Sequence, residues 1–201
     1  MKIKKLLFVF LTFFQFSAFA TTHHILFLGD SLTEGLGVDE EQSYPRLVEK
    51  KLREKKFDVA VTNGGVSGAT SASGLRRLKW HLKKKTDVLV LELGANDGLR
   101  GLKLSVTEKN LSEIIAYAKN QKIKVLLLGV LMPPNYGKKY VSDFEGMYKK
   151  IAATQRVPFF PFLLKGVAGN AEFNQADGIH PNIKGHEMVA KNVAEFVEKN
   201  L

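Results

Sequence analysis

In Ile25-Leu26-Phe27-Leu28-Gly29-Asp30-Ser31-Leu32-Thr33, a short apolar run ends abruptly at a glycine. Four apolar residues of mixed branching before a turn-forming residue predict a buried strand that stops at Gly29. Such a strand delivers Ser31 to its carboxyl end, where open α/β sheets hold their ligands. A serine hydroxyl is a weak nucleophile, so it needs a base, and the base needs a group that orients it. Both are present near the other end of the chain, in Asp177-Gly178-Ile179-His180-Pro181.

The rest of the chain alternates between apolar strands and amphipathic helices. Further strands are expected at 58–62, 87–93, 124–132 and 157–163, and helices at 46–56, 71–85, 104–121, 141–153 and 183–200. This alternation predicts an α/β fold with a parallel sheet covered on both faces. We expect a single-domain, flavodoxin-like three-layer sandwich over residues 21–201, with a five-stranded sheet in the order 2-1-3-4-5. In that order the first three strands end at one crevice, beside Ser31.

The first twenty residues have the pattern of a signal peptide. Three lysines lie within residues 1–5, an apolar run follows at 6–16, and Ala18-Phe19-Ala20 has the small-x-small pattern of a cleavage site. The apolar run is shorter than the ~20 residues that span a bilayer, which argues against a membrane anchor. The chain has no cysteine, so a lipoprotein attachment, a disulfide and a thiol nucleophile are all excluded. We expect cleavage after Ala20 and a periplasmic or secreted protein.

The chain is basic, with a formal net charge of +10, and removal of residues 1–20 leaves +7. Most of its lysines come in pairs or short runs at helix-like positions, which solvated helix faces explain. The alternative is attraction to anionic lipid headgroups or acidic substrates. No basic stretch is interleaved with exposed-looking aromatics, so nucleic acid is not an expected partner. We expect a monomer that associates weakly with membrane surfaces.

Four motifs together resemble those of the SGNH (GDSL) hydrolases. They occur in the family's order: Gly29-Asp30-Ser31, Asn63-Gly64-Gly65-Val66-Ser67-Gly68, Gly94-Ala95-Asn96-Asp97-Gly98 and Asp177-Gly178-Ile179-His180-Pro181. Further similarity runs through residues 99–101, 134–137 and 157–158, so the resemblance covers essentially the whole mature chain. Within the family, the sequence is most similar to the periplasmic thioesterase, lysophospholipase and arylesterase type.

The resemblance implies a role for each motif. Ser31 would attack the acyl carbonyl, His180 would act as general base, and Asp177 would orient the imidazole. The backbone N–H groups of Ser31 and Gly68 and the side-chain amide of Asn96 would form the oxyanion hole. No cofactor is implied. From their places in or beside the loops at the strand ends, we expect five residues to contact the acyl chain: Leu99, Leu102, Met132, Tyr136 and Phe162.

Some positions depart from simple patterns. The chain has no Gly-x-Ser-x-Gly, so the strained nucleophile elbow of α/β-hydrolases is not expected. Gly64-Gly65 replaces bulkier residues that we expect before Val66, and this predicts a looser loop around Gly68. Glu92 lies inside an apolar strand, where we expect it to pair with backbone donors. Asp30 and Asp97 could be metal ligands together with His180, but no second histidine is well placed beside them.

We therefore predict a serine esterase that hydrolyses acyl esters and thioesters, such as aryl esters, acyl-CoA and lysophospholipids, through an acyl-enzyme. One alternative is a carbohydrate O-acetylesterase with the same triad, against which Leu99 and Leu102 count. The other is a non-catalytic lipid-binding protein of the envelope, which would have no use for Asp177 and His180 beside Ser31.

Overall fold

The computed structural model describes residues 22–201, so the expected signal peptide at 1–20 lies outside the described part. A parallel sheet of five strands forms the centre, in the order β2-β1-β3-β4-β5. This confirms the predicted order. The strands are β1 (His23–Gly29), β2 (Val59–Gly65), β3 (Val88–Leu91), β4 (Lys124–Leu128) and β5 (Phe159–Phe160).

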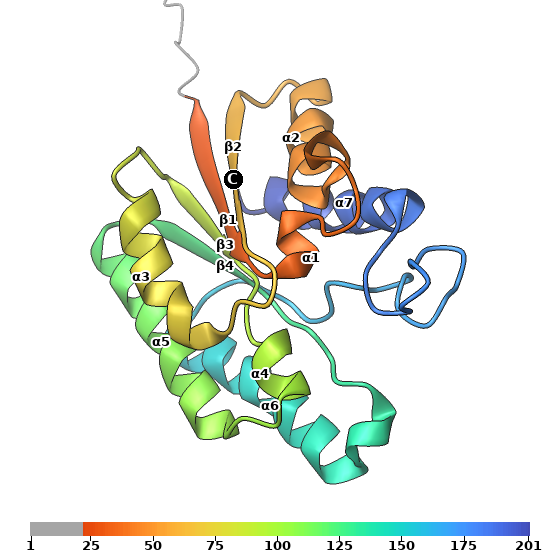
Figure 1. Ribbon diagram of the computed structural model, residues 1–201. Helices are drawn as coiled ribbons and strands as arrows, with labels where there is room; N and C mark the ends of the chain where they lie inside the picture. The colour runs from red at the N-terminus through yellow and green to blue at the C-terminus, as the bar shows by residue number, and fades with distance from the viewer. Residues whose placement is uncertain (1–21) are drawn as a thin grey trace, which may run out of the picture.

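Helices cover both faces of the sheet, as predicted (Figure 1). On one face lie α2 (Tyr44–Glu54) and α7 (Ile183–Glu198), and on the other lie α3 (Ser71–His81), α5 (Leu104–Asn120) and α6 (Lys138–Gln155). Apart from His23, His24 and Lys124 at their amino ends, the central strands are apolar, because both of their faces are buried under these helices. Over residues 22–201, no helix combines the length and the apolar character that crossing a membrane requires.

Two short helices follow directly after strands and were not predicted. They are α1 (Ser31–Glu34) after β1 and α4 (Ala95–Leu99) after β3. Each is too short to show a helical period in the sequence. Two turns of 3₁₀-helix, η1 (Glu40–Gln42) and η2 (Pro134–Tyr136), also lie in loops that follow the carboxyl ends of strands β1 and β4.

The predictions for the last two strands were too long. β4 ends at Leu128 instead of residue 132, and β5 has two residues instead of seven. Pro158 and Pro161 flank β5, and proline has no N–H with which to extend a ladder. The ladder between β4 and β5 is therefore limited to two residue pairs, Leu127 with Phe159 and Leu128 with Phe160.

At the opposite edge, side chains of α2 bind the outward-facing backbone of β2. Arg53 donates to the carbonyl of Val59 (2.9 and 3.0 Å), and Arg46 donates to the carbonyl of Val61 (3.0 Å). The N–H of Val61 donates to Glu49 Oε1 (3.3 Å). α2 thus takes the place of a further strand along β2.

His186 ties α7 to α2 in the interior. Its side chain is buried, and Nδ1 accepts the backbone N–H of Tyr44 (3.2 Å), which places the ring hydrogen on Nε2. Nε2 has no hydrogen-bond partner. Burial, and secondarily the charge of His180, lower the pKa of His186 to about 4. The folded protein therefore holds this imidazole in its neutral form at neutral pH.

We predict that His186 makes the fold acid-sensitive between pH 6.5 and 4. In this pH range His186 is protonated in the unfolded chain but stays neutral in the folded chain. The free energy of unfolding therefore falls as pH drops through this window, by about 3 kcal/mol in all. His186→Gln keeps an acceptor for Tyr44 and removes the titration. Chemical denaturation at pH 7 and pH 4.5 should show a smaller loss for the variant than for the wild type, and equal losses would contradict this assignment.

Candidate active site

Ser31 is the first residue of α1, immediately after β1. Asp30 caps this helix, because its Oδ1 accepts the N–H of Leu32 (3.0 Å). The turn needs a glycine at position 29, since a Cβ there would lie 1.9 Å from Thr33 Oγ1. Strand, glycine and cap together fix the serine at the carboxyl edge of the sheet.

His180 and Asp177 lie beside Ser31, although they follow it by almost 150 residues. His180 Nε2 is 2.9 Å from Ser31 Oγ, and His180 Nδ1 is 2.6 Å from Asp177 Oδ2. Asp177 Oδ1 also accepts the backbone N–H groups of Ile179 (2.9 Å) and His180 (3.0 Å). The His180 side chain, followed by these two N–H groups, lowers the pKa of Asp177 to about 2. An ionised Asp177 favours the tautomer with hydrogen on Nδ1, which leaves Nε2 free to accept the serine proton.

Gln175 joins the segment after Ser31 to the turn that carries His180. Its Nε2 donates to the carbonyls of Leu36 (2.6 Å) and Pro181 (3.0 Å), and its N–H donates to the carbonyl of His180 (2.8 Å). Within residues 22–201, two hydrogen bonds connect segments 31–38 and 174–181: the Ser31–His180 contact and the Gln175–Leu36 bond. Sequence reasoning missed Gln175, whose one signal is its place two residues before Asp177.

The loop that carries Gly68 is anchored from two sides. The Ser67 N–H and hydroxyl both donate to Glu34 Oε2, the former over 2.8 Å, and Arg100 Nη2 donates to the Gly68 carbonyl (3.1 Å). Gly68 has a φ of +74°, a conformation that favours glycine. A Cβ on Gly65 would lie 2.0 Å from the backbone nitrogen of Glu34. Gly65 thus lets α1 pack directly on β2.

Asn96 lies on α4, between the segments of Ser31 and Gly68. Its Nδ2 donates to Asp30 Oδ2 (3.2 Å) and to the carbonyl of Ala69 (3.1 Å). Both amide hydrogens are therefore engaged, through two long bonds. The structure brings the amide next to the capping residue of α1 and to the residue that follows Gly68.

Glu92 is fully buried beneath the turn between β1 and α1. Its Oε2 accepts the Asp30 N–H (3.2 Å) and the Thr33 hydroxyl (2.8 Å), so the expected backbone donor is present. Burial, followed by the negative charge of Asp30, raises the pKa of Glu92 well above its usual range, and burial also raises the pKa of Asp30. The two carboxyl groups therefore favour a shared proton over two charges.

Asp97 has a structural environment. Its carboxylate accepts the Ser71 N–H (2.8 Å) and hydroxyl (2.5 Å) and the Thr107 hydroxyl (3.2 Å), which joins α4 to α3 and α5. In the described range, 22–201, no three or more histidine, aspartate and glutamate side chains are grouped to hold a metal ion.

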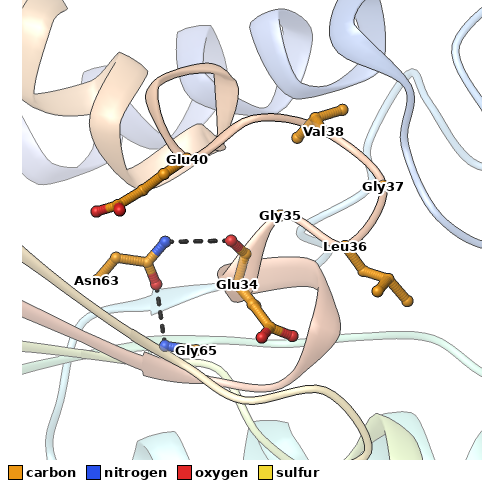
Figure 2. Close-up of a pocket in the computed structure, with 8 residues that line it drawn as sticks. All are labelled: Glu34, Gly35, Leu36, Gly37, Val38, Glu40, Asn63 and Gly65. Carbon is orange, nitrogen blue, oxygen red and sulfur yellow. Dashed lines mark hydrogen bonds between the residues drawn. The ribbon is translucent and has the colours of Figure 1, made fainter.

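The residues expected to contact an acyl chain differ in their surroundings. Leu99 and Tyr136 are close together, because the Tyr136 hydroxyl donates to the Leu99 carbonyl (3.1 Å). Met132 is buried against Gly98, Leu102 is exposed, and Phe162 is half-buried beyond β5. A cavity of about 440 Å³ lies beside α1 and the end of β2, and none of these five residues lines it. Figure 2 shows its lining, in which Asn63 bridges the Glu34 carbonyl and the Gly65 N–H.

Over most of its length, the chain is similar to known esterases and thioesterases. The chain is 40% identical over 175 residues to "Esterase TesA" of Pseudomonas aeruginosa, covering 87% of each sequence. It is 37% identical over 192 residues to "Thioesterase 1/protease 1/lysophospholipase L1" of Escherichia coli K12, covering 95% of this chain and 90% of the relative. The solved structure "Crystal Structure of TesA" superposes with a TM-score of 0.86 at 39% identity, over 89% of this chain and all of that one.

The family model described as "GDSL-like Lipase/Acylhydrolase family" matches residues 27–188, which include all four motifs. The chain therefore belongs to the GDSL-like lipase/acylhydrolase family.

Proposed function

We propose that this hydrolase cleaves acyl esters and thioesters with Ser31 as nucleophile, His180 as general base and Asp177 as the group that orients the base. The observation that carries the proposal is the continuous contact from Ser31 Oγ through the His180 ring to Asp177, at 2.9 and 2.6 Å. Both distances lie in the range of hydrogen bonds between a nucleophile, its base and the orienting group.

In the first half-reaction, Ser31 Oγ forms a bond to the acyl carbon while its proton passes to His180 Nε2. The resulting imidazolium faces an ionised Asp177, which stabilises the new charge. His180 then gives the proton to the departing alkoxide or thiolate, and the acyl group stays on Ser31. In the second half-reaction, His180 takes a proton from water, the hydroxide attacks the acyl-enzyme, and the carboxylic acid leaves as the proton returns to Ser31.

We assign stabilisation of the oxyanion to the N–H groups of Ser31 and Gly68 and to the Asn96 amide. The anchoring of the Gly68 loop by Glu34 and Arg100 supports this role, because donors that are held in place before reaction cost little reorganisation. Asn96 must release one of its two long bonds to reach the oxyanion. Catalytic hydrogen bonds are often poorly aligned before substrate binds, so this rearrangement is compatible with the role.

Apolar side chains around the site favour substrates with apolar acyl groups over acetylated carbohydrates. Among the described residues, five of the exposed large hydrophobic side chains lie in the loops next to the triad and oxyanion segments: Leu36, Val66, Leu102, Tyr136 and Ile179. A site for a small acetyl group on a sugar would need a polar surface instead. We therefore infer a preference for aryl esters, acyl thioesters and lysophospholipids.

Replacement of the nucleophile tests the proposal directly. Ser31→Ala should leave a folded protein whose turnover of p-nitrophenyl esters falls by several orders of magnitude, with ~10⁶ as the scale found when a triad serine is removed. A fluorophosphonate should label the wild type and not the variant. Near-wild-type turnover by correctly folded Ser31→Ala protein would exclude Ser31 from the mechanism.

The role of Asn96 gives a smaller effect. Loss of one of three oxyanion donors should lower kcat of Asn96→Ala by ~10² to 10³ with little change in KM, and fluorophosphonate labelling should become slower without being abolished. Asn110→Ala is a matched control. It also removes a half-buried hydrogen bond of a side-chain amide, from Asn110 Nδ2 to Ser71 Oγ (2.9 Å), but at a position away from Ser31. If both variants lose stability alike and keep their kcat, Asn96 is only structural.

Gln175 is a positioning residue in this mechanism. Gln175→Glu is nearly isosteric but places an oxygen against the carbonyls of Leu36 and Pro181, so the turn carrying His180 should shift relative to Ser31. Misplacement by about 1 Å can cost ~10²-fold, and we expect a 10- to 100-fold fall in kcat at unchanged KM. Gln121→Glu makes the same chemical change at an exposed position after α5 and should keep full activity. Equal kcat in the two variants would remove Gln175 from the mechanism.

A further inference from the structure

Trp80 lies in the last turn of α3 and is 63% exposed. It is the one tryptophan of the chain. The same helix buries Ser71, Gly74 and Leu78 against the core, so Trp80 points away from the face that holds the helix in place. A large aromatic side chain left in water at a helix end contributes little to folding, and it can contact a partner when cations accompany it.

Positive charge surrounds this side chain. Residues 71–86 contain no acid, and Arg76, Lys79, Lys83 and Lys84 are all exposed. Lys124 lies across the edge of the sheet, where it pairs in register with Val88 and donates its N–H to the Asp87 carbonyl (3.0 Å). We name the residues Arg76, Lys79, Trp80, Lys83, Lys84 and Lys124 the Trp80 surface.

The helix dipole explains only part of this cluster. Lys79 lies in the last turn of α3, where a cation is favourable, and its Nζ also lies 5.0 Å from the centre of the Tyr117 ring. Lys83 and Lys84 lie beyond the helix and form no ion pair within the described residues. The exposed indole gains nothing from the dipole. Cations around an indole are the combination that suits the interface of an anionic bilayer, where the ring reaches the headgroup region and the cations meet the surface charge.

Acidic side chains lie beside Ser31 at the carboxyl edge of the sheet. The loop after Ser31 carries Glu34, Asp39, Glu40 and Glu41, all exposed, and Asp177 is exposed beside His180. These acids would be repelled by anionic headgroups.

We propose that the Trp80 surface docks this protein on an anionic phospholipid bilayer. The surface lies at the amino edge of the sheet, where β1 and β3 begin and the His24 N–H donates to Asp87 (2.8 Å). Ser31 and His180 lie at the carboxyl edge. The bound protein thus turns its active site away from the membrane and toward substrates dissolved in the aqueous phase.

Emission from Trp80 tests this, because no other tryptophan contributes to the signal. Vesicles of phosphatidylethanolamine and phosphatidylglycerol should shift the emission to the blue at low salt, and phosphatidylcholine vesicles should not. Lys83→Glu combined with Lys84→Glu should lower the partition coefficient roughly 25-fold or more, at a factor of about five for each lost cation. Lys50→Glu combined with Lys191→Glu makes the same change of net charge on exposed positions of α2 and α7, outside the ion pairs of the described residues, and should bind nearly as the wild type does.

Three results would overturn the proposal: no blue shift with anionic vesicles, equal losses in the two double variants, or sedimentation with vesicles while Trp80 emission stays unchanged. The last would mean that another face, such as the apolar loops around Ser31, binds the bilayer. Hydrolysis of water-soluble p-nitrophenyl acetate by vesicle-bound wild type should match that of free protein, and inhibition on binding would contradict the proposed orientation. The emission measurement also works with Ser31→Ala, so docking can be judged whether or not the proposed function holds.

Discussion

The contact between Ser31 Oγ and His180 Nε2 is the interaction on which the geometry of the candidate site depends, because it joins the segment after the first strand to a turn before the last helix. The two residues are 149 positions apart in the sequence, so their 2.9 Å contact depends on how the intervening strands and helices pack. The sheet order supplies it by placing β1 near the centre. Gly29 supplies the local part, since any side chain there would collide with Thr33 and push the serine out of position.

The sequence was informative where hydrophobic pattern and turn chemistry agree. The five strands, the strand order and the long helices follow from alternation of apolar runs with amphipathic segments, and Ser31, Asp177 and His180 stood out through family motifs. Neighbours that act through tertiary contact could not be predicted. Gln175 acquires its role only because Leu36 lies opposite it, and Glu34 because Ser67 does. The two residues of β5 likewise reflect the flanking prolines more than the apolar character of 157–163.

Two carboxyl groups of the site, Asp177 and Glu92, differ in burial and in ionisation. Asp177 is half-exposed, accepts hydrogen bonds from His180 and Ile179, and stays ionised. Glu92 is enclosed under Ser31 and resists ionisation, so it can hold Asp30 and Thr33 in place without adding a second full charge beneath Ser31. The two carboxyl groups thus differ in charge because Asp177 is exposed to solvent while Glu92 is fully buried.

Both edge strands of the sheet, β2 and β5, are protected against pairing with a strand of another molecule. An open edge offers unpaired N–H and C=O groups to any extended strand, which is the usual start of aggregation. Along β2, the carbonyls of Val59 and Val61 accept hydrogen bonds from Arg53 and Arg46. The Val61 N–H donates to Glu49. At β5, two residues between prolines are too few to template a ladder. A chain without cysteines thus carries its own protection against intermolecular β-sheet growth, built from one helix and two prolines.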